Sequence, residues 1–291
     1  MKRQFAWNAH QLEEDAKTAL SFTPKGLISA LKHAKGLGYR GMTLVPLLFH
    51  PDLTAEVAGE IAEGENMQID TCLFLPGDQF NPHSKDGKKK ARDAVIQQGA
   101  YQQHWFKRKV GGGTLWGPSG QGFMGEFDLD GYKDWVYNLS LVAADLDLLA
   151  AIEVLNQFEQ SKAPMNIFDL TANVIDEVTI NGRVGLHYDT VHAFMRMGHE
   201  KMLDFYRRHR SKIFVLELAN KDRLPFDQDC GIDFAAHVSE TQNLHPSVRL
   251  GAEAFCTTVV KELKLDFYNT PFLGRVARER NAAYLKERGW M

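Results

Sequence analysis

Short apolar runs alternate with longer amphipathic stretches along the whole chain of 291 residues. Each apolar run is a candidate buried strand, and the stretches between the runs have helical spacing. This alternation predicts an α/β protein with a parallel sheet. The candidate strands are Gln4–Asn8, Gly41–Pro46, Ile69–Leu75, Val110–Trp116, Leu149–Leu155, Arg183–Tyr188, Lys212–Leu218 and Val248–Ala254.

The amphipathic segments separate these strands at intervals of roughly 30 to 40 residues, the size of a strand–helix unit. Eight such units fit a (β/α)8 barrel, which needs about 250 residues. We therefore predict a single TIM barrel in one domain over residues 1–291. An open doubly wound sheet is less favoured, because no Gly-x-Gly-x-x-Gly follows the first strand. The predicted helical segments are Pro24–Leu37, Asp52–Glu63, Ser84–Phe106, Asp130–Leu146, Ile167–Asn181, Phe194–His209 and Asp233–Asn243.

Charge and cysteine content narrow the function class. With 34 basic and 37 acidic residues the net charge is −3, which favours neither nucleic acid nor an anionic membrane as a partner. The cysteines, Cys72, Cys230 and Cys256, are far apart, so we expect a reducing, cytoplasmic compartment. Residues Met1–His10 lack the apolar segment of a signal peptide. The most apolar stretch, Leu139–Leu155, carries three acids and is not a membrane span.

The late strands share one unusual feature, a carboxylate at or near the end of each. Glu153, Asp189, Glu217 and Glu253 interrupt or follow runs that should be buried. A buried carboxylate is destabilising unless it is paired, hydrogen-bonded or bound to a metal. In a barrel, the C-terminal ends of the strands converge at the mouth where active sites lie. Four acids meeting there would repel one another, and a divalent cation is the simplest remedy.

These motifs resemble the ketose 3-epimerases of the tagatose/psicose epimerase group, within the xylose-isomerase-like barrel superfamily. The segment from Glu153 to Glu159, Glu-Val-Leu-Asn-Gln-Phe-Glu, matches the spacing of the family's strand 5. Asp189-Thr-Val-His192 matches its strand 6, and Glu253-Ala-Phe255 matches its strand 8. Only these late strands carry specific matches.

The resemblance implies roles for individual residues. Glu153, Asp189 and Glu253 would bind a divalent metal, and Glu153 and Glu253 would also form the acid/base pair. The other implied contacts are to substrate hydroxyls and the carbonyl end of the substrate. These would come from Glu159, His192 and Arg223. Whether the chain forms a homo-oligomer stays open, although dimers or tetramers are common in the family it resembles.

The seventh strand departs from the family pattern. The family has a metal-binding His six residues before the Arg, and Glu217 stands at that place here. Glu217 either replaces this His as the fourth ligand or turns away and leaves the site altered. An all-oxygen shell would favour hard ions, with Mn2+ or Mg2+ expected, over zinc.

We therefore predict a metal-dependent isomerase, a sugar epimerase that works beside a ketone. One carboxylate removes a proton, an enediolate forms, and a second carboxylate returns a proton to the opposite face. The expected partner is a small sugar or keto-polyol. Among the aromatic residues, Trp116, expected after the fourth strand at the mouth, is the best candidate for packing against it.

Other functions stay open at this stage. A keto-polyol dehydratase or a keto-acid isomerase would use the same metal and the same enolate. A barrel that has lost its metal and serves as a non-catalytic sugar-binding protein is the third reading. A DNA-repair endonuclease of the same superfamily is disfavoured, because the late strands supply too few histidines for a trinuclear zinc site.

Overall fold

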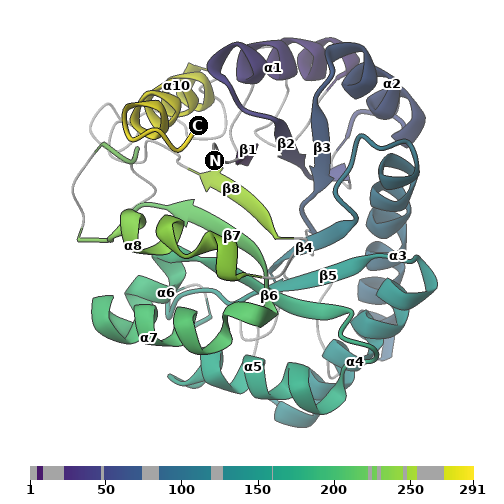
Figure 1. Cartoon of the computed structure of the whole chain (residues 1–291). Coiled ribbons are helices and arrows are strands. Elements are labelled where there is room, and N and C mark those ends of the chain that lie inside the picture. The colour runs from purple at the N-terminus through teal and green to yellow at the C-terminus, as the bar shows by residue number, and fades with distance from the viewer. Residues whose placement is uncertain are drawn as a thin grey trace.

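A computed structural model shows strands at the centre of the molecule and helices around them (Figure 1). The structure describes most of the chain, and the description below is confined to that part. Within it, none of the helices has the length and apolarity needed to cross a bilayer. The described residues are 5–8, 23–46, 49–73, 85–118, 127–158, 160–221, 225–227, 231–244, 248–253 and 272–291.

Eight parallel strands form one sheet in the order β3-β2-β1-β8-β7-β6-β5-β4. The two edge strands also meet, since Cys72 and Trp116 form a parallel bridge and the Leu73 amide donates to the Trp116 carbonyl at 2.6 Å. The sheet therefore closes, and the predicted (β/α)8 barrel is confirmed. The strands are β1 (Phe5–Asn8), β2 (Gly41–Leu44), β3 (Gln68–Thr71), β4 (Thr114–Pro118), β5 (Leu149–Glu153), β6 (Val184–Asp189), β7 (Ile213–Ala219) and β8 (Arg249–Glu253).

The helices cover the outside of the barrel, and α10 lies beside α1, so that the two ends of the helical ring meet (Figure 1). Contacts between these two helices include the ion pair of His33 with Glu279, whose atoms lie 3.0 Å apart. The helices are α1 (Pro24–Leu37), α2 (Ala55–Glu65), α3 (Lys85–Lys107), α4 (Leu129–Asp145), α5 (Ile167–Val178), α6 (Thr190–Met197), α7 (His199–His209), α8 (Phe234–Ser239) and α10 (Phe272–Glu287), with 3-10 turns η3 (Arg210–Lys212) and η5 (Thr241–Asn243).

Several predicted boundaries differ from the observed ones, and three of these differences have local reasons. The fourth strand begins at Thr114 rather than Val110, because Lys109 and Gly113 both have positive φ and cannot continue a strand. The predicted helix Phe194–His209 is two helices, divided at Gly198 with φ of 73°. The first of them, α6, starts four residues earlier than predicted, directly after β6.

The floor of the barrel is held by a partly buried ion pair. On β8, Arg249 donates from Nε to Oδ2 of Asp70 on β3 at 2.9 Å, and its Nη2 donates to Gln68 at 2.9 Å. The other oxygen of Asp70 accepts from the Gly112 amide at 2.7 Å and from Gln102 at 3.1 Å. This end of the barrel therefore supplies its buried carboxylate with a fixed cation and with hydrogen-bond donors.

Above this floor, a small apolar cluster fills the interior. It consists of Trp116, Ala151, Phe214 and Val215, all of them buried. The next inward-facing positions toward the mouth belong to the acids of the late strands, because alternate residues of a strand share a face.

Candidate functional site

The four acids predicted at the strand ends are brought together by the barrel. Glu153 and Asp189 are the last residues of β5 and β6, Glu217 lies opposite Asp189 on β7, and Glu253 ends β8. Their exposed fractions are 7% or less. Ligand atoms of Asp189, Glu217 and Glu253 lie within 4.8 Å of one another. Glu153 forms two further groups at the same spacing, one with His187 and Glu217 and the other with Asp189 and His192. The predicted convergence at one mouth is thus observed, while the role of each acid stays a prediction.

The two carboxylate oxygens of Asp189 have different partners. Its Oδ1 accepts hydrogen bonds from the amides of Val191 at 2.7 Å and His192 at 3.4 Å, which makes it the N-cap of α6. Its Oδ2 lies 3.7 Å from Nε2 of His192, on the side of the site. Asp189 therefore ends β6 and caps α6 with Oδ1, while its Oδ2 faces His192.

The side chain of Glu217 on β7 extends over Gly251, its neighbour on β8, which has no side chain. A Cβ added at Gly251 on β8 would come 3.1 Å from Oε1 of Glu217. The other oxygen, Oε2, is 2.9 Å from Nε2 of His187. Glu217 is therefore directed into the interior, and of the two readings left open by the sequence, the one in which it turns away from the site is not what the structure shows.

His187 is a site residue that the sequence analysis missed. It lies two residues before Asp189 on β6, so both side chains face the interior. Its Nδ1 is 3.8 Å from Oε2 of Glu153, and the edge of Trp116 packs against its ring with 4.7 Å between centroids. The signal that could have identified it is this spacing of two from a predicted ligand.

His192 lies beside Glu153, as its place in the motif implied. Its Nε2 is 3.3 Å from Oε1 of Glu153. Its Nδ1 accepts from the backbone amide of Asn156 at 3.2 Å, in the loop after β5. A neutral imidazole that accepts at Nδ1 carries its proton on Nε2, so His192 presents a donor to the acids.

Burial and the neighbouring carboxylates shift the pKa values of three groups in or beside the cluster. Burial raises the pKa of the Glu217 carboxyl, and the hydrogen bond with His187 offsets only part of that rise. Burial opposes the charged form of His187, but Glu153 and Glu217 outweigh it and raise its pKa. At the end of β3, burial and then the charges of Glu153, Glu217 and Glu253 raise the pKa of the free thiol of Cys72, which keeps that sulfur protonated.

The donor set fits a divalent cation. Four buried carboxylates converge, and Nδ1 of His187 is buried without a hydrogen-bond partner among the described residues. Buried polar atoms are nearly always satisfied, so an unsatisfied imidazole nitrogen beside carboxylates indicates a missing ligand. Carboxylate and imidazole donors together suit Mg2+, Mn2+ and the later divalent metals.

The remaining predicted site residues differ in what the structure says of them. Glu159 and Arg223 lie outside the described residues. Trp116 is within β4 rather than in a loop after it, and at 1% exposure it packs under His187. By contrast, Phe158 in the loop after β5 is 74% exposed, which makes it the described aromatic residue that is open to a ligand at the mouth.

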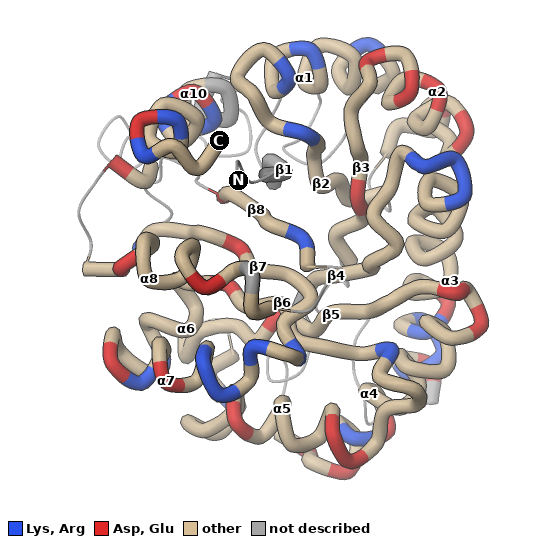
Figure 2. Tube along the Cα trace, viewed as in Figure 1, with Lys and Arg blue, Asp and Glu red and all other residues tan. Residues whose placement is uncertain are grey.

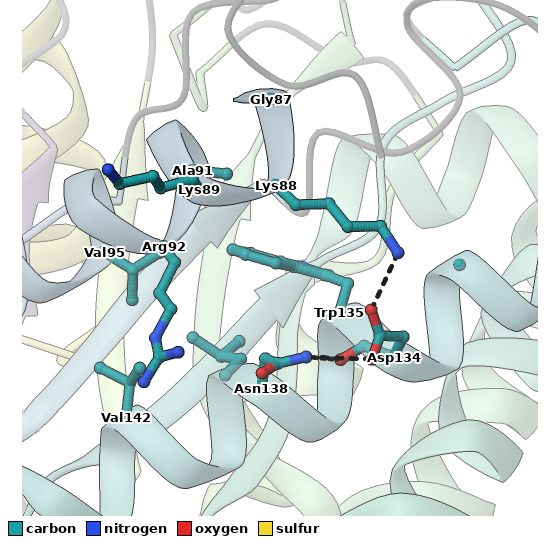
Figure 3. Close-up of a pocket in the computed structure, with 12 residues that line it drawn as sticks. Gly87, Lys88, Lys89, Ala91, Arg92, Val95, Asp134, Trp135, Asn138 and Val142 are labelled. Carbon is teal, nitrogen blue, oxygen red and sulfur yellow. Dashed lines mark hydrogen bonds and ion pairs between the residues drawn. The ribbon is translucent and has the colours of Figure 1, made fainter. Parts of the chain in front are cut away.

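A cavity of about 270 Å³ lies elsewhere, between α3 and α4 on the outside of the barrel (Figure 3). Lys88 reaches across it to Asp134 at 3.2 Å, and the ring of Trp135 lies between the two helices. Charged positions gather on the outer helices in general, with few along the strands (Figure 2). None of the residues that line this cavity belongs to the acid cluster, so the cavity is not the site of the chemistry proposed below.

Comparison with solved structures places the fold among sugar epimerases. An L-ribulose 3-epimerase superposes with a TM-score of 0.76 at 16% identity, covering 100% of this chain and 95% of its own. A D-psicose 3-epimerase with D-tagatose, from Clostridium cellulolyticum H10, gives 0.75 at 15% identity and covers 99% of both chains. The chain shares the TIM-barrel fold of these enzymes. No protein-family model and no curated protein sequence matches the chain.

The same fold also includes an AP endonuclease of family 2 from Brucella melitensis, with a TM-score of 0.65 at 14% identity over 86% of this chain and 92% of that one. Identities this low establish the fold alone, and one fold hosts unrelated activities. The resemblance expected from the strand-end motifs is confirmed at the level of the fold. The function has to be argued from the acid cluster.

Proposed function

We propose that this protein is a metal-dependent sugar epimerase or isomerase that acts beside a ketone. The observation that carries the proposal is the cluster of buried carboxylates at the barrel mouth, in which Asp189, Glu217 and Glu253 lie within 4.8 Å of one another and Glu153 lies within the same distance of Asp189 and of Glu217. The solved structures that share its fold include epimerases of ketoses, which makes a ketose or keto-polyol the substrate class to test first.

The cation site in this proposal consists of Glu153, Asp189, Glu217 and Glu253, with Mn2+ or Mg2+ as the expected ion. When bound, the cation would polarise a carbonyl and an adjacent hydroxyl of the substrate and make the intervening C–H more acidic. A bound cation would also relieve the repulsion between these neighbouring carboxylates.

Glu153 and Glu253 are the proposed acid/base pair. They end β5 and β8, which are separated in the sheet by β6 and β7, so they approach the interior from different sides. A base on one face removes the proton to give an enediolate, and an acid on the other face returns one, which inverts the carbon. A single base could only exchange the proton or move it along the chain.

The substrate contacts proposed around this pair come from the mouth. The Nε2–H of His192 points at Glu153, where it can donate to a substrate hydroxyl or hold the carboxylate in place. Glu159 and Arg223 complete the proposed substrate set, whereas Trp116, 1% exposed, supports the ring of His187 from below. Phe158 supplies an exposed ring on which the apolar face of a sugar could pack.

A keto-polyol dehydratase or a keto-acid isomerase is the second candidate, and the specific observation in its favour is Glu217. A carboxylate in place of the family's imidazole adds negative charge and makes the bound cation a weaker Lewis acid. The proton removal would be common to both functions, and the fate of the enediolate would separate them.

Solvent exchange tests the proposal. The purified protein, loaded with Mn2+ or Mg2+, is incubated with a panel of ketoses in D2O, and deuterium incorporation beside the ketone is followed by NMR. Epimerisation gives a deuterated diastereomer, whereas a dehydratase gives loss of water and an isomerase gives a shifted carbonyl. No exchange with any ketose or keto acid, in protein shown to bind the cation, would leave a sugar-binding barrel as the better reading.

A further inference from the structure

The two histidines of the site turn different ring nitrogens toward Glu153: His192 turns its Nε2, and His187 turns its Nδ1. His192 accepts at Nδ1 from the Asn156 amide, so its Nε2 carries a proton toward Glu153. His187 is reversed, because its Nε2 lies 2.9 Å from Oε2 of Glu217 and a carboxylate can only accept from it. With Glu217 ionised, as a nearby cation would hold it, the proton of neutral His187 is on Nε2, and its Nδ1 carries a lone pair.

This lone pair is buried beside carboxylates, and no described donor makes a hydrogen bond to it. Nδ1 of His187 has no hydrogen-bond partner among the described residues, and the carboxylate oxygen of Glu153 nearest to it is 3.8 Å away. The ring cannot rotate freely, since Trp116 packs on it at 4.7 Å and Glu217 holds its other nitrogen. A lone pair held in this way toward a carboxylate is unfavourable, and either a proton on Nδ1 or a cation between the two atoms relieves the repulsion.

We propose that His187 binds the cation of this site through Nδ1, with Glu217 accepting the Nε2 proton and orienting the ring. The inference rests on the proposed function, which supplies the cation, and adds a nitrogen ligand that the strand-end motifs do not contain. A metal-binding imidazole commonly donates its second N–H to a carboxylate in this way. A carboxylate that accepts from Nε2 lies on the far side of the ring from Nδ1, so in this arrangement Glu217 holds the imidazole in place, and Glu153, Asp189 and Glu253 are the carboxylates left to bind the same cation.

The consequence is a mixed shell in place of an all-oxygen one. The imidazole that the seventh strand lacks is supplied from β6, two residues before Asp189. Imidazole nitrogen raises the affinity for Mn2+, Co2+ and Zn2+ relative to Mg2+. The preference should therefore shift away from the hard ions that four carboxylates alone would select.

The experiment is pulsed EPR of Mn2+ bound to the full-length protein, prepared with natural-abundance histidine and with 15N-histidine. A directly coordinated nitrogen is expected in the wild-type protein, and its coupling should change with the isotope. The coupling should vanish in His187→Gln and persist in His192→Gln, the matched control from the same cluster. The Kd for Co2+ should rise at least tenfold in His187→Gln, and Glu217→Gln should weaken Co2+ binding by about 10-fold to 100-fold.

The outcomes separate this inference from the function on which it rests. Bound Mn2+ with no coordinated nitrogen in the wild-type protein overturns the role of His187 and leaves a carboxylate site intact. Coupling that survives in His187→Gln but is lost in His192→Gln assigns the nitrogen to His192 instead. If Mn2+ does not bind at all, the metal-dependent function falls, and this inference with it. The wild-type isotope comparison decides the question even if His187→Gln fails to fold.

Discussion

Oε1 of Glu217 lies where a side chain on Gly251 would be, 3.1 Å from the position of the missing Cβ. The two residues face each other in the register of β7 and β8. Glycine at this position is therefore what allows a glutamate, longer than the histidine that the related motif has there, to reach the interior. Gly251, which has no functional group, therefore affects the proposed cation site through Glu217.

Substitution of Gly251 by Ala should displace Glu217. We expect a loss of about 1–3 kcal/mol in unfolding free energy, typical of overpacking, together with weaker binding of Mn2+. Urea unfolding with EDTA present and titration with Mn2+ measure the two effects. The matched control is Gly64→Ala in α2, where no atom lies within 4 Å of the added Cβ. This control should gain about 0.5–1 kcal/mol, because alanine is the better helix residue. Unchanged Mn2+ affinity in Gly251→Ala would remove Glu217 from the site.

Replacing Glu153 or Glu253 by Gln should abolish turnover while the fold survives. Each change removes a proposed acid/base group with little change in volume, and such groups contribute about 10²-fold to 10⁴-fold to rate. The measurement is kcat on whichever ketose shows solvent exchange, with circular dichroism to check the fold. Glu287→Gln on α10, an acid with 79% of its side chain exposed, is the control and should keep full activity. Retained turnover in either active-site variant would exclude that residue from proton transfer.

The cation should stabilise the folded protein. A ligand that binds only the folded state adds about 2.7 kcal/mol at a hundredfold excess over its Kd. The melting temperature, measured after EDTA treatment and again with Mn2+, should therefore rise. Asp189→Asn is the informative variant, since asparagine also caps a helix well but carries no charge. It should melt close to the wild-type protein without the ion and lose the increase with it. A wild-type melting temperature that is indifferent to every divalent ion tested contradicts the site.

His237 in α8 should make the protein sensitive to mild acid. Burial, the largest cause, lowers its pKa from 6.5 to about 4. Below pH 6.5 the unfolded chain takes up a proton that the folded state refuses, so stability present at pH 7 is lost as the pH falls toward 4. The pKa difference corresponds to about 3 kcal/mol. Urea unfolding of metal-free protein at pH 7 and pH 4.5 should show a smaller pH dependence for His237→Gln than for the wild-type protein. Equal slopes would mean that His237 can be protonated in place.

The strand ends could be predicted because their acids interrupt runs that are otherwise apolar, which is a strong signal against the background of a buried strand. His187 has a weaker signal, its spacing of two from Asp189, because a histidine inside a strand is ordinary and only the contacts with Glu153 and Glu217 place it in the site. The break at Gly198 was missed because one glycine within a helical pattern is usually tolerated. The early start of α6 was missed for a different reason. Asp189 was interpreted as a ligand, and its second role as an N-cap was not considered.

The position of Trp116 could not be predicted from its own strand, because it depends on the pairing of β4 with the residues after β3. Its neighbours Gly117 and Pro118 indicated a loop, yet the strand continues through both of them. Gly117 has a φ of 152° and its missing Cβ would meet the Leu73 backbone at 2.4 Å, so this glycine permits the close approach of β3 and β4 that closes the barrel. Such closure involves residues far apart in sequence and leaves no periodic signal in either strand.

The ion pair of Arg249 with Asp70 has a consequence for how molecules would pass through this protein. With that pair and the cluster around Trp116 filling the interior beneath the acids, the barrel has a closed bottom. Substrate would then enter, and product leave, at the same end of the barrel as the acids. An accumulating product would compete directly with the next substrate for this site.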